Sequence, residues 1–347
     1  MRTRRSRLLL VAVGLLISAG AVVYLLLGLR GAWGGLADAF GEAHYGYVLA
    51  SIAPIALMYV LRVLRWKVLL RPIADVPYGT IAGATCIGFM SSCLLPLRPG
   101  ELIRPYVLHR RSGVSFGDAA GTAMGLERVF DLLGVCFLIL LTWATLGAEA
   151  MGSDALRAAS AWAARMTGVG LAGVVLLVAW PAAMLRLAAF ILRPLPANWR
   201  GVLLAFAESV ARAMAVLRNP GQVALALVLS LAAWLMFPLS TFVLAKGFGL
   251  DLGFGAALVI QVCVTAAVAL PQAPGFIGPF QVATMKAAEL FGVADGDAGA
   301  FAMMLWAVHV VPITIVGLAF LRHEGLNLLE LARASEQAAE PDTEGAS

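Results

Sequence analysis

Charged residues are scarce in this chain, making up 13% of its 347 residues, against about 25% in a soluble domain. Its four cysteines form no CxxC pair, and its four histidines share no metal-ligand spacing. We also find no nucleophile–base set and no glycine-rich nucleotide loop. These absences argue against a soluble domain, a cysteine motif and a metal site, and they predict no cofactor, no catalytic residues and no enzymatic activity.

Apolar residues are abundant instead, at 61% of the chain with a mean hydropathy of +0.90. Several runs reach the roughly 17–25 residues that a helix needs to cross a bilayer. Residues 8–29 follow the basic stretch RTRRSR and exceed the roughly 7–15-residue core of a cleaved signal peptide, so they predict an uncleaved span. Further apolar segments occupy 47–64, 79–97, 117–146, 167–185, 221–245, 254–271 and 297–321. The fold class that we expect is an all-α polytopic membrane protein.

The distribution of basic residues predicts how these segments cross, because Lys and Arg accumulate in cytoplasmic loops. If residues 79–111 and 254–291 each enter and leave on one side, the inside regions hold nineteen Lys and Arg and the outside regions five. The inside regions include a loop after the second span that holds four of them, Arg62, Arg65, Lys67 and Arg71. We therefore predict six full spans, two re-entrant hairpins and both termini in the cytoplasm, or eight spans if the hairpins cross.

Each predicted hairpin turns at a related motif, LPLRPG at 95–100 and LPQAPG at 270–275. Proline interrupts a helix and glycine permits a sharp reversal of the backbone. The predicted turn residues are Pro96, Pro99 and Gly100 in the first hairpin and Pro271, Pro274, Gly275, Gly278 and Gln281 in the second. The alternative is that both motifs are ordinary helix-ending loops at the membrane surface.

A second repeated phrase follows each turn, GVSFGDAAGTAMGLERV at 113–129 and GVADGDAGAFAMMLWAV at 292–308. Three predicted spans separate the two copies, and an odd number inverts the second copy relative to the first. We predict an inverted repeat with units at about 79–146 and 254–321, within one transmembrane domain over 1–325. Inverted repeats are common in transporters, whose substrate sites lie beside interrupted helices at the repeat interface.

Ionisable residues inside the apolar segments are candidates for the site. Glu127 lies about 15 Å along its helix if that helix starts near Gly117, close to mid-bilayer, where charged side chains are costly and mark functional sites. Asp131 shares its face, and Arg128 reaches Asp131 at a spacing of three residues. The alternative role is a structural ion pair between helices.

Basic residues around the first turn form a second candidate group. Arg98, Glu101 and Arg104 lie within the proline–glycine hairpin, and guanidinium groups bind phosphate through paired donors. For the neighbouring Arg110 and Arg111 we favour a topological role at the cytoplasmic boundary. We predict that Arg98, Glu101, Arg104, Glu127, Arg128 and Asp131 bind substrate.

The runs RPGELIRPYVLHRRSG, GLERVFDLL and PGFIGPFQ resemble the lysylphosphatidylglycerol synthase transmembrane-region family over about residues 8–325. The resemblance implies movement of an anionic or aminoacylated phospholipid, or another lipid-linked molecule, across the bacterial cytoplasmic (inner) membrane. Phe276 stands where the family usually has glycine and Gln281 where it usually has glutamate. The missing carboxylate argues against a proton-linked or cation-binding role for the second hairpin.

The expected function is therefore a lipid flippase with membrane lipids as partners and no nucleic-acid partner. Two alternatives stay open: a membrane subunit that scaffolds a lipid- or glycan-modifying enzyme, and a transporter of a small soluble anion. A homo-oligomer is also compatible with the sequence. Residues 198–218 predict either a surface helix or a connector helix, and the polar tail at 326–347 is expected to be disordered.

Overall fold

The computed structural model describes residues 33–95, 98–146, 219–269 and 274–326, together with residues 16, 18–23, 165, 168, 201, 209 and 210. All regular structure in these ranges is helical. Several predictions fall outside the described residues, wholly or for the most part: the spans at 8–29 and 167–185, the turn residues Pro96 and Pro271, the segment at 198–218 and the tail.

Four continuous helices are long and apolar enough to cross a membrane, and each coincides with a predicted span. The shortest of them, α3, has 26 residues, which at 1.5 Å per residue exceeds the roughly 30 Å hydrocarbon core of a bilayer. Three of the four are α3 (Tyr45–Leu70), α11 (Pro220–Gly247) and α14 (Asp295–His323). The fourth is continuous over Phe116–Leu146 and consists of α6 (Phe116–Ala120), the π-helical turn η2 (Gly121–Leu126) and α7 (Glu127–Leu146). The molecule is thus a multi-pass helical membrane protein.

Two further apolar helices are shorter, and each is followed by a break and a second short helix. The first pair is α4 (Tyr78–Leu94) with α5 (Gly100–Ser112), and the second is α12 (Phe254–Ala269) with α13 (Pro279–Glu289), preceded by the 3₁₀ turn η4 (Pro274–Phe276). Helices α4 and α12 have 17 and 16 residues, so each is roughly 25 Å long and too short to cross the roughly 30 Å core without tilt or thinning. The remaining described helix, α2 (Trp33–Glu42), packs on α14.

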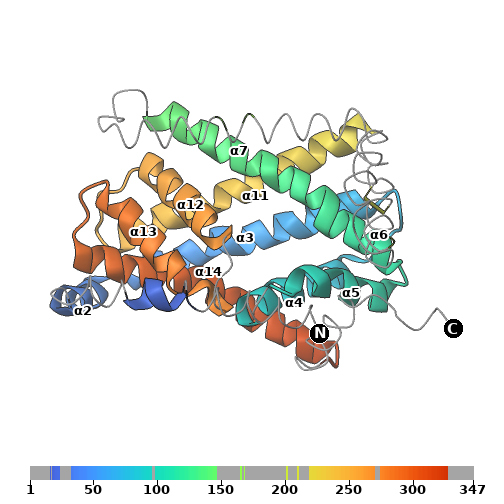
Figure 1. Cartoon of the computed structure of the whole chain (residues 1–347), viewed down its shortest axis with the longest axis horizontal. Helices are drawn as coiled ribbons and strands as arrows, with labels where there is room; N and C mark the ends of the chain where they lie inside the picture. The colour runs from blue at the N-terminus through green and yellow to red at the C-terminus, as the bar shows by residue number, and fades with distance from the viewer. Residues whose placement is uncertain are drawn as a thin grey trace.

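The two halves repeat one order of elements: a short helix, a break, a second short helix and a long helix. In both, a glycine in the left-handed region separates the second short helix from the long one, Gly113 with φ 70° and Gly292 with φ 80°. A residue with a Cβ is strained at such a φ, which accounts for glycine at this point of both phrases. In Figure 1 the helix ending in α7 runs from right to left, whereas α14 runs from left to right.

Close helix packing holds these elements together. Helices α3 and α11 lie against each other, and the Ser240 hydroxyl donates to the Ser51 carbonyl oxygen at 2.7 Å. Within the first short pair, a Cβ on Gly100 would lie 1.8 Å from the Gly88 carbonyl oxygen. Glycine at position 100 therefore permits close backbone approach between α4 and α5, and its φ is not positive.

One prediction about the chain's course is wrong. Arg62, Arg65 and Lys67 were expected in a cytoplasmic loop, but α3 continues to Leu70 and all three side chains are buried in it. The helix continues because Arg62 and Arg65 pair with carboxylates of α7. Lys67 bonds to the turn that follows α3. There the Lys67 ammonium donates to the Val76 carbonyl oxygen at 2.6 Å and to the Asp75 carboxylate. The hydrogen bond from the Lys67 ammonium to the Asp75 carboxylate holds the pKa of that carboxyl below its usual range.

Candidate functional site

Three helices contribute to a buried ion cluster of five side chains, namely Arg62 and Arg65 from α3, Arg104 from α5, and Glu127 and Asp131 from α7. Arg65 lies between the two carboxylates, with Nη1 2.8 Å from Asp131 Oδ1 and Nη2 3.3 Å from Glu127 Oε1. Arg104 Nη1 lies 2.8 Å from Glu127 Oε2, and Arg62 Nη1 lies 3.6 Å from Asp131 Oδ2. The cluster connects the first short-helix pair to two of the long helices.

Burial of these charges is nearly complete. Arg65 is 0% exposed, Glu127 1% and Arg104 5%. Taking a charged group out of water costs roughly several kcal/mol. Opposite charges and hydrogen bonds are needed to offset that cost. Each member of the cluster therefore depends on its partners.

Aromatic rings surround the inner end of Arg104. Its guanidinium carbon lies 4.4 Å from the centre of the Trp66 ring and 5.1 Å from that of Phe89. Trp66 is itself fixed by a hydrogen bond from Nε1 to the Thr122 hydroxyl oxygen at 3.1 Å, in the π-helical turn before Glu127. Such π-helical turns are frequent at functional sites.

A second, more exposed ion pair lies beside the cluster. Arg128 Nη2 lies 2.6 Å from Glu101 Oε1, and Arg128 Nη1 lies 3.7 Å from Asp131 Oδ2. The side chains of Arg128 and Glu101 are 48% and 38% exposed, so water screens this pair and it stabilises the fold by less than about 1 kcal/mol. Because both side chains are partly exposed, a ligand can reach this pair at the edge of the buried cluster.

The two helix breaks meet at Arg98. Its guanidinium donates to the carbonyl oxygen of Val268 near the end of α12, and its carbon lies 4.9 Å from the centre of the Phe276 ring. Both Arg98 and Phe276 have a positive φ, at 53° and 59°, a conformation that non-glycine residues adopt at an energetic cost. Each break thus contributes one strained residue to the contact.

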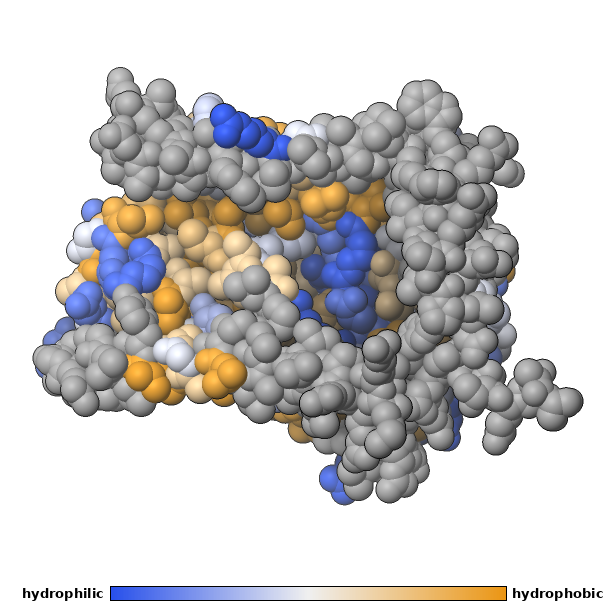
Figure 2. Space-filling view, in the orientation of Figure 1, coloured by the Kyte–Doolittle hydropathy of each residue, from blue (hydrophilic) through white to orange (hydrophobic). Residues whose placement is uncertain are grey.

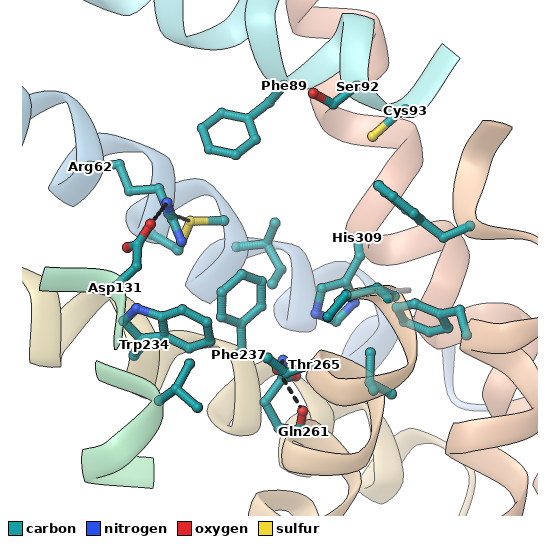
Figure 3. Close-up of a pocket in the computed structure, with 18 of the residues that line it drawn as sticks. Arg62, Phe89, Ser92, Cys93, Asp131, Trp234, Phe237, Gln261, Thr265 and His309 are labelled. Atoms are coloured by element: carbon teal, nitrogen blue, oxygen red, sulfur yellow. Dashed lines mark hydrogen bonds and ion pairs between the residues drawn. The ribbon is translucent and has the colours of Figure 1, made fainter. Parts of the chain in front are cut away.

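A cavity of about 420 Å³ is lined by the four long helices together with α4, α12, α13 and the two helix breaks. Its charged part includes Arg62, Arg98, Arg128 and Asp131. Figure 3 shows Arg62 and Asp131 facing each other beside Trp234, with Phe237 and His309 further into the cavity. In the orientation of Figure 1, Figure 2 shows a recess with hydrophobic walls and a hydrophilic patch within it. A charged part next to apolar walls suits an amphiphilic ligand.

Neutral groups from α11, α12 and α14 line another part of the cavity. The His309 ring stacks on Phe237 with centres 5.6 Å apart, and Gln261 Nε2 donates to the Thr265 hydroxyl oxygen at 3.1 Å. Two buried ring nitrogens, Trp234 Nε1 and His309 Nε2, make no hydrogen bond in the described part of the chain. These groups can offer hydrogen bonds to a ligand without adding charge.

The structure brings all six predicted substrate-binding residues into one region. Arg104 and Glu127 pair inside the cluster, Glu101 pairs with Arg128, and Asp131 and Arg98 line the cavity. Sequence reasoning missed Arg62 and Arg65. Their spacing of three residues inside the amphipathic run VLRVLRWKVLL was the available signal, since it places both on one face of a continuing helix.

The predicted turn residues differ in what they do. Gly275 and Gly278 have φ values of 75° and 97°, as a sharp reversal requires. Pro99 and Pro274 lie at the two breaks, Pro99 immediately before α5 and Pro274 at the start of η4. Gln281 accepts a hydrogen bond from the Gly278 amide at 2.8 Å, so it stabilises the start of α13.

A helical membrane protein with two interrupted helices and a charged cavity between them is the class that these observations define. The chain belongs to the family described as the lysylphosphatidylglycerol synthase TM region, whose model matches residues 11–317. No solved structure matches the chain.

The chain is also similar to a curated protein of Haloferax volcanii named Glycosyltransferase AglD, with 25% identity over 347 aligned positions. The alignment covers 91% of this chain and 54% of the relative, so the chain spans about half the length of the curated relative it matches. The prediction that the chain is not an enzyme is contradicted by this relative, whose name is that of an enzyme. The inference from missing motifs was too broad, because arginines and carboxylates like those gathered here are also groups that enzymes use.

Proposed function

We propose that this protein is a lipid translocase that moves a lipid with a phosphate-bearing headgroup, an anionic or aminoacylated phospholipid or another lipid-linked molecule, across the bacterial cytoplasmic membrane. The observation that carries the proposal is the cavity, where Arg62, Arg98 and Arg128 border walls of apolar and aromatic side chains. Guanidinium groups bind phosphate oxygens strongly. The headgroup would pass through the cavity while the acyl chains stay in the bilayer.

The proposal includes a topology in which the two halves form an inverted repeat. The short lengths of α4 and α12 support re-entrant hairpins that meet within the membrane. The opposite directions of α7 and α14 in Figure 1 support the inversion of the second half relative to the first. Non-helical backbone at that depth must be buried in protein or line a watery cavity. The contact between Arg98 and Val268 supports this proposal, because it gives one carbonyl oxygen near the end of α12 a donor from the other break.

Cysteine labelling tests the topology. In a background with the four native cysteines replaced by serine, Pro72→Cys and Arg110→Cys at the two ends of the first short pair are expected to react from the cytoplasmic side. Asp251→Cys and Leu290→Cys at the ends of the second pair are expected to react from the outside. Membrane-impermeant maleimide on intact cells and on inverted vesicles reports the side. Labelling of Pro72→Cys and Arg110→Cys from opposite sides would exclude the first hairpin.

A dithionite-quench assay on proteoliposomes tests the function. Headgroup-labelled phosphatidylglycerol is expected to become accessible faster than in protein-free liposomes, and Arg128→Ala is expected to slow this by roughly 10- to 100-fold, because a charge-assisted hydrogen bond contributes about 1.5–3 kcal/mol. Arg110→Ala removes an exposed arginine of α5 that does not line the cavity, and it serves as the control. A wild-type rate in Arg128→Ala would remove Arg128 from the path.

A second candidate is a membrane subunit that works with, or forms part of, a lipid- or glycan-modifying enzyme. The similarity to a protein named as a glycosyltransferase favours it. Under this candidate no labelled lipid flips in proteoliposomes, and Arg128→Ala lowers the assembly of a complex. Flipping by the purified chain by itself would favour the translocase.

A further inference from the structure

The charges of the cavity and of the ion pairs beside it do not balance within the described residues. The arginines are Arg62, Arg65, Arg98, Arg104 and Arg128, and the carboxylates are Glu101, Glu127 and Asp131. Five arginines against three carboxylates leave a formal net charge of +2. Uncompensated positive charge within low-dielectric surroundings attracts an anion strongly.

Every one of these carboxylates is already occupied by arginine. Asp131 lies within ion-pair distance of Arg62, Arg65 and Arg128. The other two carboxylates are held by arginines as well, in the contacts given above. To pair with Glu127 or Asp131, a ligand ammonium group would therefore have to displace a guanidinium, which leaves a buried charge unpaired.

Of the arginines that line the described part of the cavity, Arg62 and Arg98 have donor capacity to spare. Arg98 has no carboxylate within ion-pair distance in the described part of the chain; its contacts are the carbonyl oxygen of Val268 and the ring of Phe276. Arg62 directs Nε at the sulfur of Met58, 3.2 Å away, and thioether sulfur is a weak acceptor. A phosphate oxygen is a better partner than either of these contacts.

Elsewhere in its described lining, the cavity offers a cation aromatic rings and neutral polar groups but no second carboxylate. Among the described residues that line it, Asp131 is the sole carboxylate, and the second half contributes neutral polar groups from Gln261, Thr265 and His309. The position where the family usually has glutamate holds Gln281, which is engaged with the Gly278 amide. Both halves of the site therefore lack a free acidic group.

We propose that this cavity selects a lipid phosphate ester without an ammonium group and rejects aminoacylated headgroups, with Arg98 as the specificity-determining residue. The inference rests on the proposed function and narrows its substrate class. A phosphate monoester, whose second pKa lies near 6, carries a charge between −1 and −2 at neutral pH and matches the site best. The apolar walls make a lipid, and not a soluble phosphate, the source of that group.

Binding to the purified full-length chain in nanodiscs tests the inference. Phosphatidic acid is expected to bind most tightly, followed by phosphatidylglycerol, and lysyl-phosphatidylglycerol at least about ten-fold more weakly than phosphatidic acid, consistent with the loss of one charge-assisted contact. Native mass spectrometry at matched lipid fractions measures the order. Glycerol 3-phosphate serves as the soluble probe with the same phosphate monoester and is expected to bind far more weakly.

Variants of Arg98 and Arg110 test whether Arg98 determines the headgroup selectivity. Arg98→Gln is expected to reduce the preference for phosphatidic acid by about ten-fold, Arg98→Lys to keep the order of lipids, and Arg110→Gln to change nothing. If Arg98→Gln does not fold, the order of lipid affinities in the wild type and in Arg98→Lys still tests the inference. Equal or tighter binding of lysyl-phosphatidylglycerol, or no binding of any lipid, overturns the inference.

Two further outcomes separate this inference from the proposed function. Equal binding of glycerol 3-phosphate overturns the assignment to a lipid. Flipping that shows no preference among headgroups overturns the selectivity and leaves the translocase in place, whereas absence of flipping with the predicted binding order removes the translocase and keeps the selectivity.

Discussion

Glu127→Gln is expected to destabilise the folded protein by about 3–5 kcal/mol, because removing one member of a buried ion pair leaves its partner charged and unpaired. Glu127 is 1% exposed and holds both Arg65 and Arg104. Arg65 keeps Asp131 as a partner, but in the described part of the chain Arg104 keeps only the neighbouring aromatic rings. The measurement is the melting temperature of the detergent-purified protein, with denaturant unfolding for the free energy.

A surface pair provides the matched control. Glu289 pairs with Lys286 at 2.6 Å, and the Lys286 side chain is 49% exposed. Glu289→Gln is therefore expected to cost less than about 1 kcal/mol. In the Glu127→Gln background, Arg104→Met removes the unpaired charge and should recover part of the lost stability. Equal effects of Glu127→Gln and Glu289→Gln would contradict the buried cluster.

Much of the helical arrangement follows from local sequence patterns. The apolar runs predict the four long helices, and proline with glycine predicts both breaks, because these residues act on the backbone where they occur. The repeated phrase beginning with Gly113 and Gly292 marks the same junction in both halves. Features that depend on residues close in sequence could be predicted.

The site could be predicted only in part. Glu127, Arg128 and Asp131 were recognisable because charges are rare inside apolar helices. Arg62 and Arg65 were not, because basic residues near the end of an apolar run are also what a cytoplasmic boundary requires. Their partners lie 62 to 69 positions further along the chain, and only the packing of α3 against the helix ending in α7 shows that they are buried.

The contact between the two breaks was likewise beyond local patterns. Arg98 meets Val268 and Phe276 across about half of the chain's length. Phe276 was noted only as a departure from the family's usual glycine. Its ring contact with Arg98 gives that departure a physical role, since an aromatic face attracts a guanidinium group.

The central claim is that the cavity is the path of the lipid headgroup, and reversible blocking tests it most directly. Thr265 lines the cavity, whereas its neighbour Ala266 is exposed and does not line it. In the background without native cysteines, a bulky methanethiosulfonate on Thr265→Cys is expected to abolish flipping of labelled phosphatidylglycerol, and a reductant is expected to restore it. The same reagent on Ala266→Cys is expected to leave the rate unchanged. Undiminished flipping after complete modification of Thr265→Cys, verified by mass spectrometry, would contradict the account.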